Sequence, residues 1–339
     1  MQRRPAPSRR CQWPLALTAM AVLASCGGGS PASSTASVSV PLPPPPTLVA
    51  SATDMALAVA GQARSITVTN TGGAAALNLN VVTSALPAGT SLNASTCGDT
   101  LATGASCALT ITPGATPTAT PGDPAPAAAV LEIAGDNTPI LRVHMAVVAY
   151  GSVHQGGYVF AIDDGTPYTG SIGGKVAALH DLPDQVSWSL SQLGVASGLH
   201  ENATAPCHAA TDGACNTALI VAADGALAPA ASLCDLSTDG GFSDWYLPAA
   251  CEQGYDTNPG FAAQVCGVQG SPLMDNMQSR LVDGGDLAGL SGKSYWGSTS
   301  WSISPMRSIL DHRFAANPFK DAQAHYIESH VRCVRAFKP

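Results

Sequence analysis

Residues 240–252 read GGFSDWYLPAACE, and this stretch carries the densest structural signals in the 339-residue chain. Asp244 is a turn-forming acid, two aromatic residues follow it, and Pro248 stands where a helix can begin, because proline is favoured in the first helical turn. The pattern predicts a core tryptophan at Trp245, a hydrogen-bonded loop at Asp244 and a helix that bears Glu252.

Further motifs lie on both sides of this stretch, between residues 151 and 339. GGYVF at 156–160 predicts a strand that runs into an acidic turn, and residues 175–179 suit its hairpin partner. Three helical segments are also expected, although the first could equally be a strand: 216–221 within NTALIVA, 230–233, and 273–282 with its helical spacing of apolar residues. The chain closes with YWGSTS at 295–300 and VRCVR at 331–335.

Taken together, these motifs resemble the Lcl C-terminal domain family, which is named after a collagen-like adhesin of Legionella. The resemblance spans nearly all of 151–339 and rests on GGFSDWYLPAACE, YWGSTS and VRCVR in that order. It implies an α+β, C-type-lectin-like fold, a ligand-binding role and a homo-trimeric assembly. Residues 301–314, WSISPMRSILDHRF, diverge from the family pattern.

The N-terminus has the layout of a bacterial lipoprotein signal peptide. Four arginines precede an apolar run of 11 residues, Trp13–Leu23, which suits a signal-peptide core and is shorter than the roughly 20 residues that span a bilayer. Leu23-Ala24-Ser25-Cys26 resembles a lipobox, so we expect residues 1–25 to be removed and Cys26 to be lipidated; an ordinary signal peptide is the alternative. Multiple acyl chains would give a stable membrane anchor. Gly27 in place of Asp favours the outer membrane by family analogy.

A tether and a β domain are expected to follow the anchor. Residues 26–47 combine the lipidated cysteine with Gly, Ser and Pro, a composition typical of a flexible to extended spacer. Residues 48–150 resemble immunoglobulin-like repeats of the ASH or choice-of-anchor type and predict an all-β immunoglobulin-like sandwich. Its expected strands include 65–69, 77–81, 108–112, 130–133 and 141–148.

Ten cysteines fit an exported, disulfide-bonded protein. Cys11 lies in the signal peptide and Cys26 is the lipid site, which leaves eight. Cys97 and Cys107 stand alone in the first domain and should pair. The remaining six permit 15 connectivities, of which we favour Cys207–Cys215, Cys251–Cys266 and Cys234–Cys333.

The net charge of the chain excludes one class of partner, and its lack of known motifs excludes several classes of site. The mature chain carries 11 basic and 23 acidic residues, a formal charge of −12, so nucleic acid is not an expected partner.

No paired CxxC and no hydrolase, metalloprotease or nucleotide-binding motif occurs in the sequence, so we expect no metal, no cofactor and no catalytic residues. Calcium at the acids 235, 239 and 244 remains an alternative, although the triplets of calcium-dependent sugar binders are absent.

Exposed aromatic residues are the candidates for ligand contact. Trp301 lies between two serines in the divergent segment and is the first choice, and Tyr326 is the second. Trp245 and Tyr246 could form a sugar-stacking platform if they are not core residues. The sequence therefore predicts an extracytoplasmic lipoprotein whose lectin-like domain binds a glycan or a surface protein at the cell surface. The alternative is a structural envelope lipoprotein without a dedicated ligand, and catalysis would gain support from a free, reactive cysteine.

Overall fold

The computed structural model describes residues 42–83, 86–94, 96–165, 170–190, 198–255, 265–303 and 308–337. Its secondary structure is predominantly β, with few helices, as the sequence predicts. Pro43–Pro339 forms one compact unit. The predicted signal peptide, the predicted lipidation site Cys26 and the predicted tether up to residue 41 lie outside the described residues.

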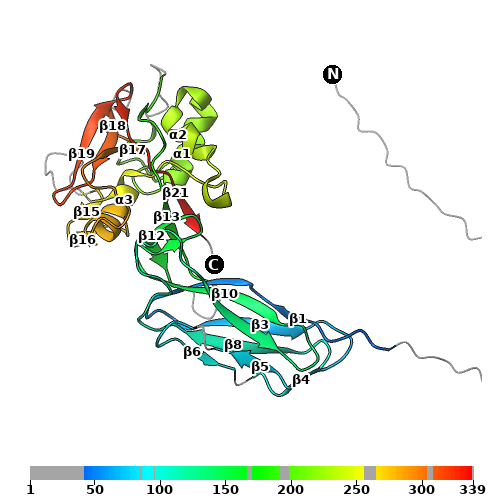
Figure 1. The fold of residues 1–339 in the computed structure, drawn as a ribbon. Helices are drawn as coiled ribbons and strands as arrows, with labels where there is room; N and C mark the ends of the chain where they lie inside the picture. Colours follow the sequence, from blue (N-terminus) through cyan, green and yellow to red (C-terminus); the bar gives the residue numbers. More distant parts are fainter. Residues whose placement is uncertain are drawn as a thin grey trace, which may run out of the picture. The chain divides into compact units, whose positions relative to one another are not determined.

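Two four-stranded sheets form the first part of this unit (Figure 1). Alternate residues of each sheet point into one shared core, so Ile66 and Leu109 of the first sheet pack with Leu131 and Val143 of the second. The period-2 pattern that predicts the strands is therefore the pattern that builds the core. The first sheet has the order β1 (Leu48–Ala50), β3 (Arg64–Asn70), β8 (Ser106–Thr112), β6 (Ser91–Asn93); the second has β2 (Asp54–Ala58), β10 (Leu141–Val148), β9 (Ala129–Ala134), β5 (Asn80–Val82).

Pairing in this sandwich is antiparallel except between β10 and β2, which run parallel. The predicted strand 77–81 is divided into β4 (Ala76–Leu77) and β5, because Asn78 adopts a left-handed backbone with φ 50°. β4 turns away to pair with β7 (Thr100–Leu101).

The second part, which we call the head, contains a four-stranded sheet, a three-stranded sheet and two small strand pairs. The predicted hairpin is confirmed as β12 (Gly157–Asp163) and β13 (Gly173–Ala178). The last strand, β21 (Val334–Phe337), returns to pair with β13, so the end of the chain joins the sheet that opens the head (Figure 1). The sheet orders are β11 (Val153–His154), β12, β13, β21, and β17 (Ser294–Ser300), β18 (Ser308–Arg313), β19 (Phe319–Ala324), with the small pairs β14 (Val186–Ser187)–β20 (Glu328–Ser329) and β15 (Gly267–Val268)–β16 (Ser271–Pro272).

Helical segments lie between these strands in sequence. Helix α1 (Gly213–Asp224) begins where the Asp212 side chain accepts the Cys215 N–H, at 3.0 Å, and the helix ends at Gly225 with φ 50°. Helix α2 (Pro229–Asp235) opens on a proline. The other segments are α3 (Ala250–Gln253), the 3₁₀ turns η2 (Gly225–Leu227) and η3 (Asp239–Gly241), and the π-helical turn η4 (Gln278–Val282).

The predicted helix 273–282 is too long at its start. Leu273 instead donates its N–H to the Cys266 carbonyl, at 2.9 Å, as the β15–β16 hairpin ends. The helical turns begin only after Asn276, whose side chain accepts the Ser279 N–H at 2.8 Å. A local cap and a hairpin therefore override the apolar spacing.

Four disulfides stabilise the chain, and their pairing agrees with the favoured one. They are Cys97–Cys107, Cys207–Cys215, Cys234–Cys333 and Cys251–Cys266. Disulfides form and persist in oxidising compartments. The four bonds indicate an extracytoplasmic protein.

Candidate functional site

The quoted stretch 240–252 and the terminal VRCVR motif pack against each other. The Arg335 guanidinium donates to both carboxylate oxygens of Asp244 and lies 3.9 Å from the centre of the Phe242 ring. Tyr246 and Val334 exchange two backbone hydrogen bonds, of 2.8 and 2.9 Å. The Cys234–Cys333 disulfide also links the terminal motif covalently to α2, the helix that precedes the stretch 240–252. These motifs are therefore a structural clamp.

The other arginine of VRCVR makes a second clamp. Arg332 donates to Asp181 at 2.7 Å, and Lys293 and the Tyr295 hydroxyl donate to the same carboxylate. Burial alone would raise the pKa of Asp181, but these partners, Arg332 first, hold it below its ordinary value. The carboxylate remains charged in the native protein and fixes the start of β17 to the C-terminus.

Trp245 and Tyr246 do not offer rings to a ligand, which corrects their inclusion among the candidates. Trp245 is 2% exposed and donates its indole N–H to the Asp239 carbonyl. Tyr246 is also buried, and its hydroxyl donates to Glu252 at 2.9 Å. Burial, followed by the Glu252 charge, raises the pKa of Tyr246 well above its usual range. Both aromatic residues are part of the core, because they lie in the stretch that packs against the VRCVR motif.

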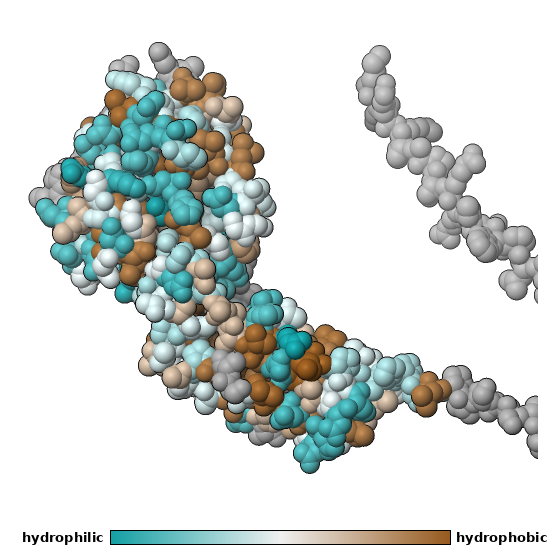
Figure 2. All heavy atoms as spheres, in the orientation of Figure 1, coloured by the Kyte–Doolittle hydropathy of each residue, from teal (hydrophilic) through white to brown (hydrophobic). Residues whose placement is uncertain are grey.

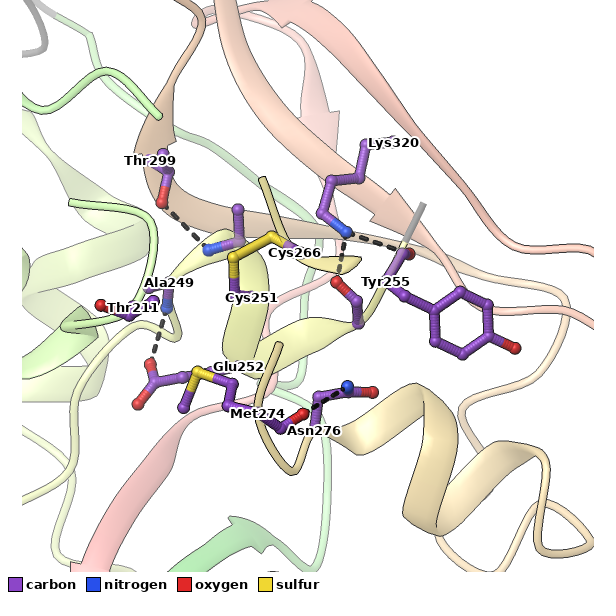
Figure 3. The surroundings of a disulfide bond; sticks show 12 residues. Thr211, Ala249, Cys251, Glu252, Tyr255, Cys266, Met274, Asn276, Thr299 and Lys320 are labelled. Carbon is purple, nitrogen blue, oxygen red and sulfur yellow. Dashed lines mark hydrogen bonds between the residues drawn. A yellow bond between two sulfur atoms is a disulfide. The ribbon is translucent and has the colours of Figure 1, made fainter. Parts of the chain in front are cut away.

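Glu252 is the buried charge that organises this region. Its carboxylate accepts the Ala249 N–H at 2.8 Å at the start of α3 (Figure 3), and it pairs with Lys175 of β13. An acid that satisfies a free N–H of a first helical turn stabilises the helix start. The predicted helix bearing Glu252 is confirmed, although it is a single turn.

The same turn of α3 carries the Cys251–Cys266 disulfide (Figure 3). Both sulfur-bearing residues are buried, with Ala250 and Leu310 beside them. Trp301 packs on this cluster and is only partly buried. Trp301 therefore rests on a cross-linked base and, as a residue, remains partly exposed.

A polar cluster lies immediately beside Trp301. Segments 200–202 and 300–302 run parallel, with hydrogen bonds from Ser300 N to Leu199 O and from Glu201 N to Ser300 O. Glu201 is buried and accepts from the Ser302 N–H at 2.6 Å and from the Ser302 hydroxyl at 2.5 Å. Asn202 is exposed and donates to Glu201 at 3.2 Å. The carboxylate thus fixes the loop that presents the indole and orients the amide next to it.

This arrangement suits recognition of a polar ligand with an apolar face. An aromatic ring provides a flat apolar surface at low entropic cost, and amide and hydroxyl groups beside it provide orientation. We define the Trp301 site as Trp301, Ser302, Glu201 and Asn202. Trp301 was predicted from the sequence, whereas Glu201 and Asn202 were not, because about 100 residues separate the two segments.

Tyr326 lies elsewhere on the head. Its side chain is 67% exposed, and its carbonyl accepts the Ser187 hydroxyl of β14. The ring meets the His325 ring edge-on, with centres 5.6 Å apart. The structure therefore groups Tyr326 with the β14–β20 pair and not with the Trp301 site.

A metal site would need several ligating side chains close together within the described residue ranges. Within these ranges no group of three or more His, Cys, Asp or Glu side chains is arranged to hold a metal ion. Of the three acids considered for calcium, Asp244 is engaged by Arg335.

Comparisons with known proteins add little to these observations. No family model matches the sequence, and no curated protein is similar to it. Among solved structures, domains 4 and 5 of the S-layer protein SbsC share 18% identity over 32% of this chain and 54% of that chain, with a TM-score of 0.22. The YadV chaperone shares 12% identity over 39% of this chain and 66% of that chain, with a TM-score of 0.23. The secreted serine protease VesC from Vibrio cholerae shares 15% identity over 39% of this chain and 33% of that chain, with a TM-score of 0.22. At TM-scores this low, these structures support no statement about the fold or the function of this chain.

Proposed function

We propose that the chain is a membrane-anchored lipoprotein whose head binds a glycan or a surface-protein ligand at the Trp301 site, in the manner of an adhesin. The observation that carries the proposal is the partly exposed Trp301 on a disulfide-linked base, beside the hydrogen-bonded Glu201, Asn202 and Ser302. A site that is rigid before binding loses little entropy when its ligand arrives.

The head is assigned to a C-type-lectin-like fold of the Lcl C-terminal type. Support comes from the return of β21 to the first sheet of the head and from the meeting of GGFSDWYLPAACE with VRCVR. The sandwich is assigned to an immunoglobulin-like spacer; its two sheets around a single core support this. A trimeric assembly follows from the family resemblance alone.

The ligand is expected to be unsulfated. The mature chain has a formal charge of −12, and Glu201 lies within the site itself. A polyanion would be repelled by such a surface, because like charges raise the free energy of the complex. This separates the chain from a binder of sulfated polysaccharides.

Membrane attachment is expected to depend on Cys26. A Cys26→Ala variant lacks the thiol that receives the lipid, so it should move from the membrane fraction to the soluble fraction after cell lysis. Fractionation followed by immunoblotting measures this. Continued membrane association of the variant would contradict the lipid anchor without affecting the binding proposal.

Ligand binding is expected to depend on Trp301. The full chain, made soluble by Cys26→Ala, is applied to an array of unsulfated and sulfated glycans and matrix proteins, with and without calcium. Removal of a stacking aromatic ring typically costs a few kcal/mol at an interface hot spot, so Trp301→Ala should weaken binding by roughly 10- to 100-fold.

Tyr326→Ala is the matched control, because it removes another exposed aromatic ring from a different part of the head. Binding that survives Trp301→Ala and is lost with Tyr326→Ala would move the site to the β14–β20 pair. No binding by a folded chain on any array would favour the structural envelope role.

A further inference from the structure

The sandwich has one long connection without regular structure, the loop 113–128 between β8 and β9. Its 16 residues are five prolines, five alanines, three threonines, two glycines and Asp123. Loops of more than about 12 to 15 residues without secondary structure are uncommon in compact domains, and an ordered one usually has a function. The Trp301 site does not use this loop, so its role has to be found in its own residues.

Backbone hydrogen bonds fix the loop at every fourth residue. The fixed positions are Gly114, Thr118 and Gly122, whose backbone groups bond to those of Ala60, Val147 and Gly151, each at 2.8 Å. Thr118 is held twice, because its hydroxyl also accepts the Val147 N–H at 2.7 Å. The Thr118 side chain is therefore turned toward β10 and engaged there.

The other two threonines lie midway between the fixed positions. Thr116 and Thr120 are exposed, and their hydroxyls make no hydrogen bond to any residue that the structure describes. Each stands directly before a proline, which disfavours the helical backbone and holds the preceding residue extended. The loop thus presents two hydroxyls to solvent on extended backbone and withholds the third.

The surface of this loop is poorly hydrated for its exposure. Asp123 is its one charged residue, whereas Figure 2 shows strongly hydrophilic residues over much of the visible face of the head. Exposed loops of small residues are also preferred sites of proteolytic cleavage. A hydrophilic group attached to the loop would remedy both weaknesses.

We propose that Thr116 and Thr120 are O-glycosylation sites. Segments rich in threonine and proline are typical carriers of O-linked glycans, and the oxidising compartment indicated by the disulfides suits a glycan on the outer surface. The sugar donor is an activated sugar, a glycosyl phosphate or pyrophosphate. The threonine Oγ1 attacks the anomeric carbon and forms the new C–O bond. The bond from that carbon to the phosphate oxygen breaks, the phosphate leaves with the electron pair, and the hydroxyl proton passes to a base of the transferring enzyme.

The test is the mass of one peptide. No Lys or Arg occurs between Arg64 and Arg142, so trypsin releases residues 65–142 as a single peptide that contains the whole loop. The full chain is purified from the bacterium that produces it, reduced and digested. The peptide should exceed the mass of its sequence by whole sugar residues. Thr116→Ala and Thr120→Ala should each remove one glycan, and the double variant should return the peptide to the mass of its sequence.

Thr118→Ala is the matched control, because it removes a threonine hydroxyl of the same loop that faces β10. Its peptide should keep both glycans. A parent peptide at the mass of its sequence overturns the proposal, and so does an excess mass that remains in the double variant. An excess that matches phosphate overturns it as well, because the two hydroxyls would then be phosphorylation sites. Membrane anchoring and ligand binding at Trp301 enter none of these outcomes.

Discussion

Removal of the Cys234–Cys333 disulfide is expected to cost the protein about 4 to 5 kcal/mol of its free energy of unfolding, because it closes a loop of about 100 residues in the unfolded chain. The two cysteines are 99 residues apart, and both are buried where the clamp closes. The free energy of unfolding of a domain is typically about 5 to 15 kcal/mol in total. The double variant Cys234→Ala/Cys333→Ala should therefore unfold at a much lower urea concentration and accumulate poorly on export.

The Cys207–Cys215 disulfide is the matched control, since its cysteines are only 8 residues apart. The same loop-entropy relation gives about 2.5 kcal/mol for so short a loop. Urea midpoints, followed by tryptophan fluorescence, should therefore fall about twice as far for Cys234→Ala/Cys333→Ala as for Cys207→Ala/Cys215→Ala. Equal losses would show that local packing around the sulfurs, and not the length of the closed loop, sets the contribution.

The disulfide pattern was predictable because chain distance restricts it. Cys97 and Cys107 have no other partner in their part of the chain, and the pairs Cys207–Cys215 and Cys251–Cys266 are near neighbours in sequence. The strands and the hairpin at 157–178 were predictable from alternation, which depends only on neighbouring residues.

Elements that depend on distant contacts were not predictable. Asn78 interrupts an alternating run because its side chain donates to Asp136 at 2.7 Å, a residue 58 positions away. No local pattern distinguishes this asparagine from others. The same holds for the early part of 273–282, where a hairpin at the disulfide replaces the expected helical turn.

The residues of the candidate site were likewise only partly predictable from the sequence. Trp301 could be chosen from the sequence as an aromatic residue in a divergent segment, but burial separates it from Trp245, and burial is a property of the whole fold. Glu201 could not be chosen, because its role depends on Ser302, 101 positions away. A carboxylate is recognised as part of a site only once the strands have brought its partner to it.

Replacement of Asp311 is expected to stabilise the protein at neutral and alkaline pH. Asp311 lies in the middle strand of the β17–β18–β19 sheet, opposite Trp296 on one side and Asp321 on the other, and is 5% exposed. Burial first, and then the charge of Asp321, raises the pKa of Asp311 from 3.8 to about 7. Between about pH 4 and pH 7 the native protein therefore holds a proton on this carboxyl that the unfolded chain releases.

The sign of the pH dependence follows from this difference. A native pKa above the unfolded value means that the native state binds more protons between the two values, so stability falls as pH rises from about 4 to about 7. Each pKa unit corresponds to about 1.4 kcal/mol, so the loss from Asp311 approaches 4 kcal/mol above pH 7. Asp311→Asn resembles the protonated carboxyl in shape and cannot ionise. The variant should match the parent near pH 4 and exceed it by up to about 4 kcal/mol at pH 8, as measured by urea unfolding at pH 4, 6 and 8.

Asp321→Asn tests how much of the rise in the pKa of Asp311 comes from burial and how much from the charge of Asp321. It removes the neighbouring charge and leaves Asp311 buried, so its gain at pH 8 should be the smaller one, because burial is the larger cause. An Asp311→Asn gain that is the same at pH 4 and pH 8 would instead trace the stabilisation to packing or to the new amide hydrogen bonds. A gain that grows from about pH 4 and levels off near pH 7 identifies the ionisation of Asp311 as the place where this sheet loses stability.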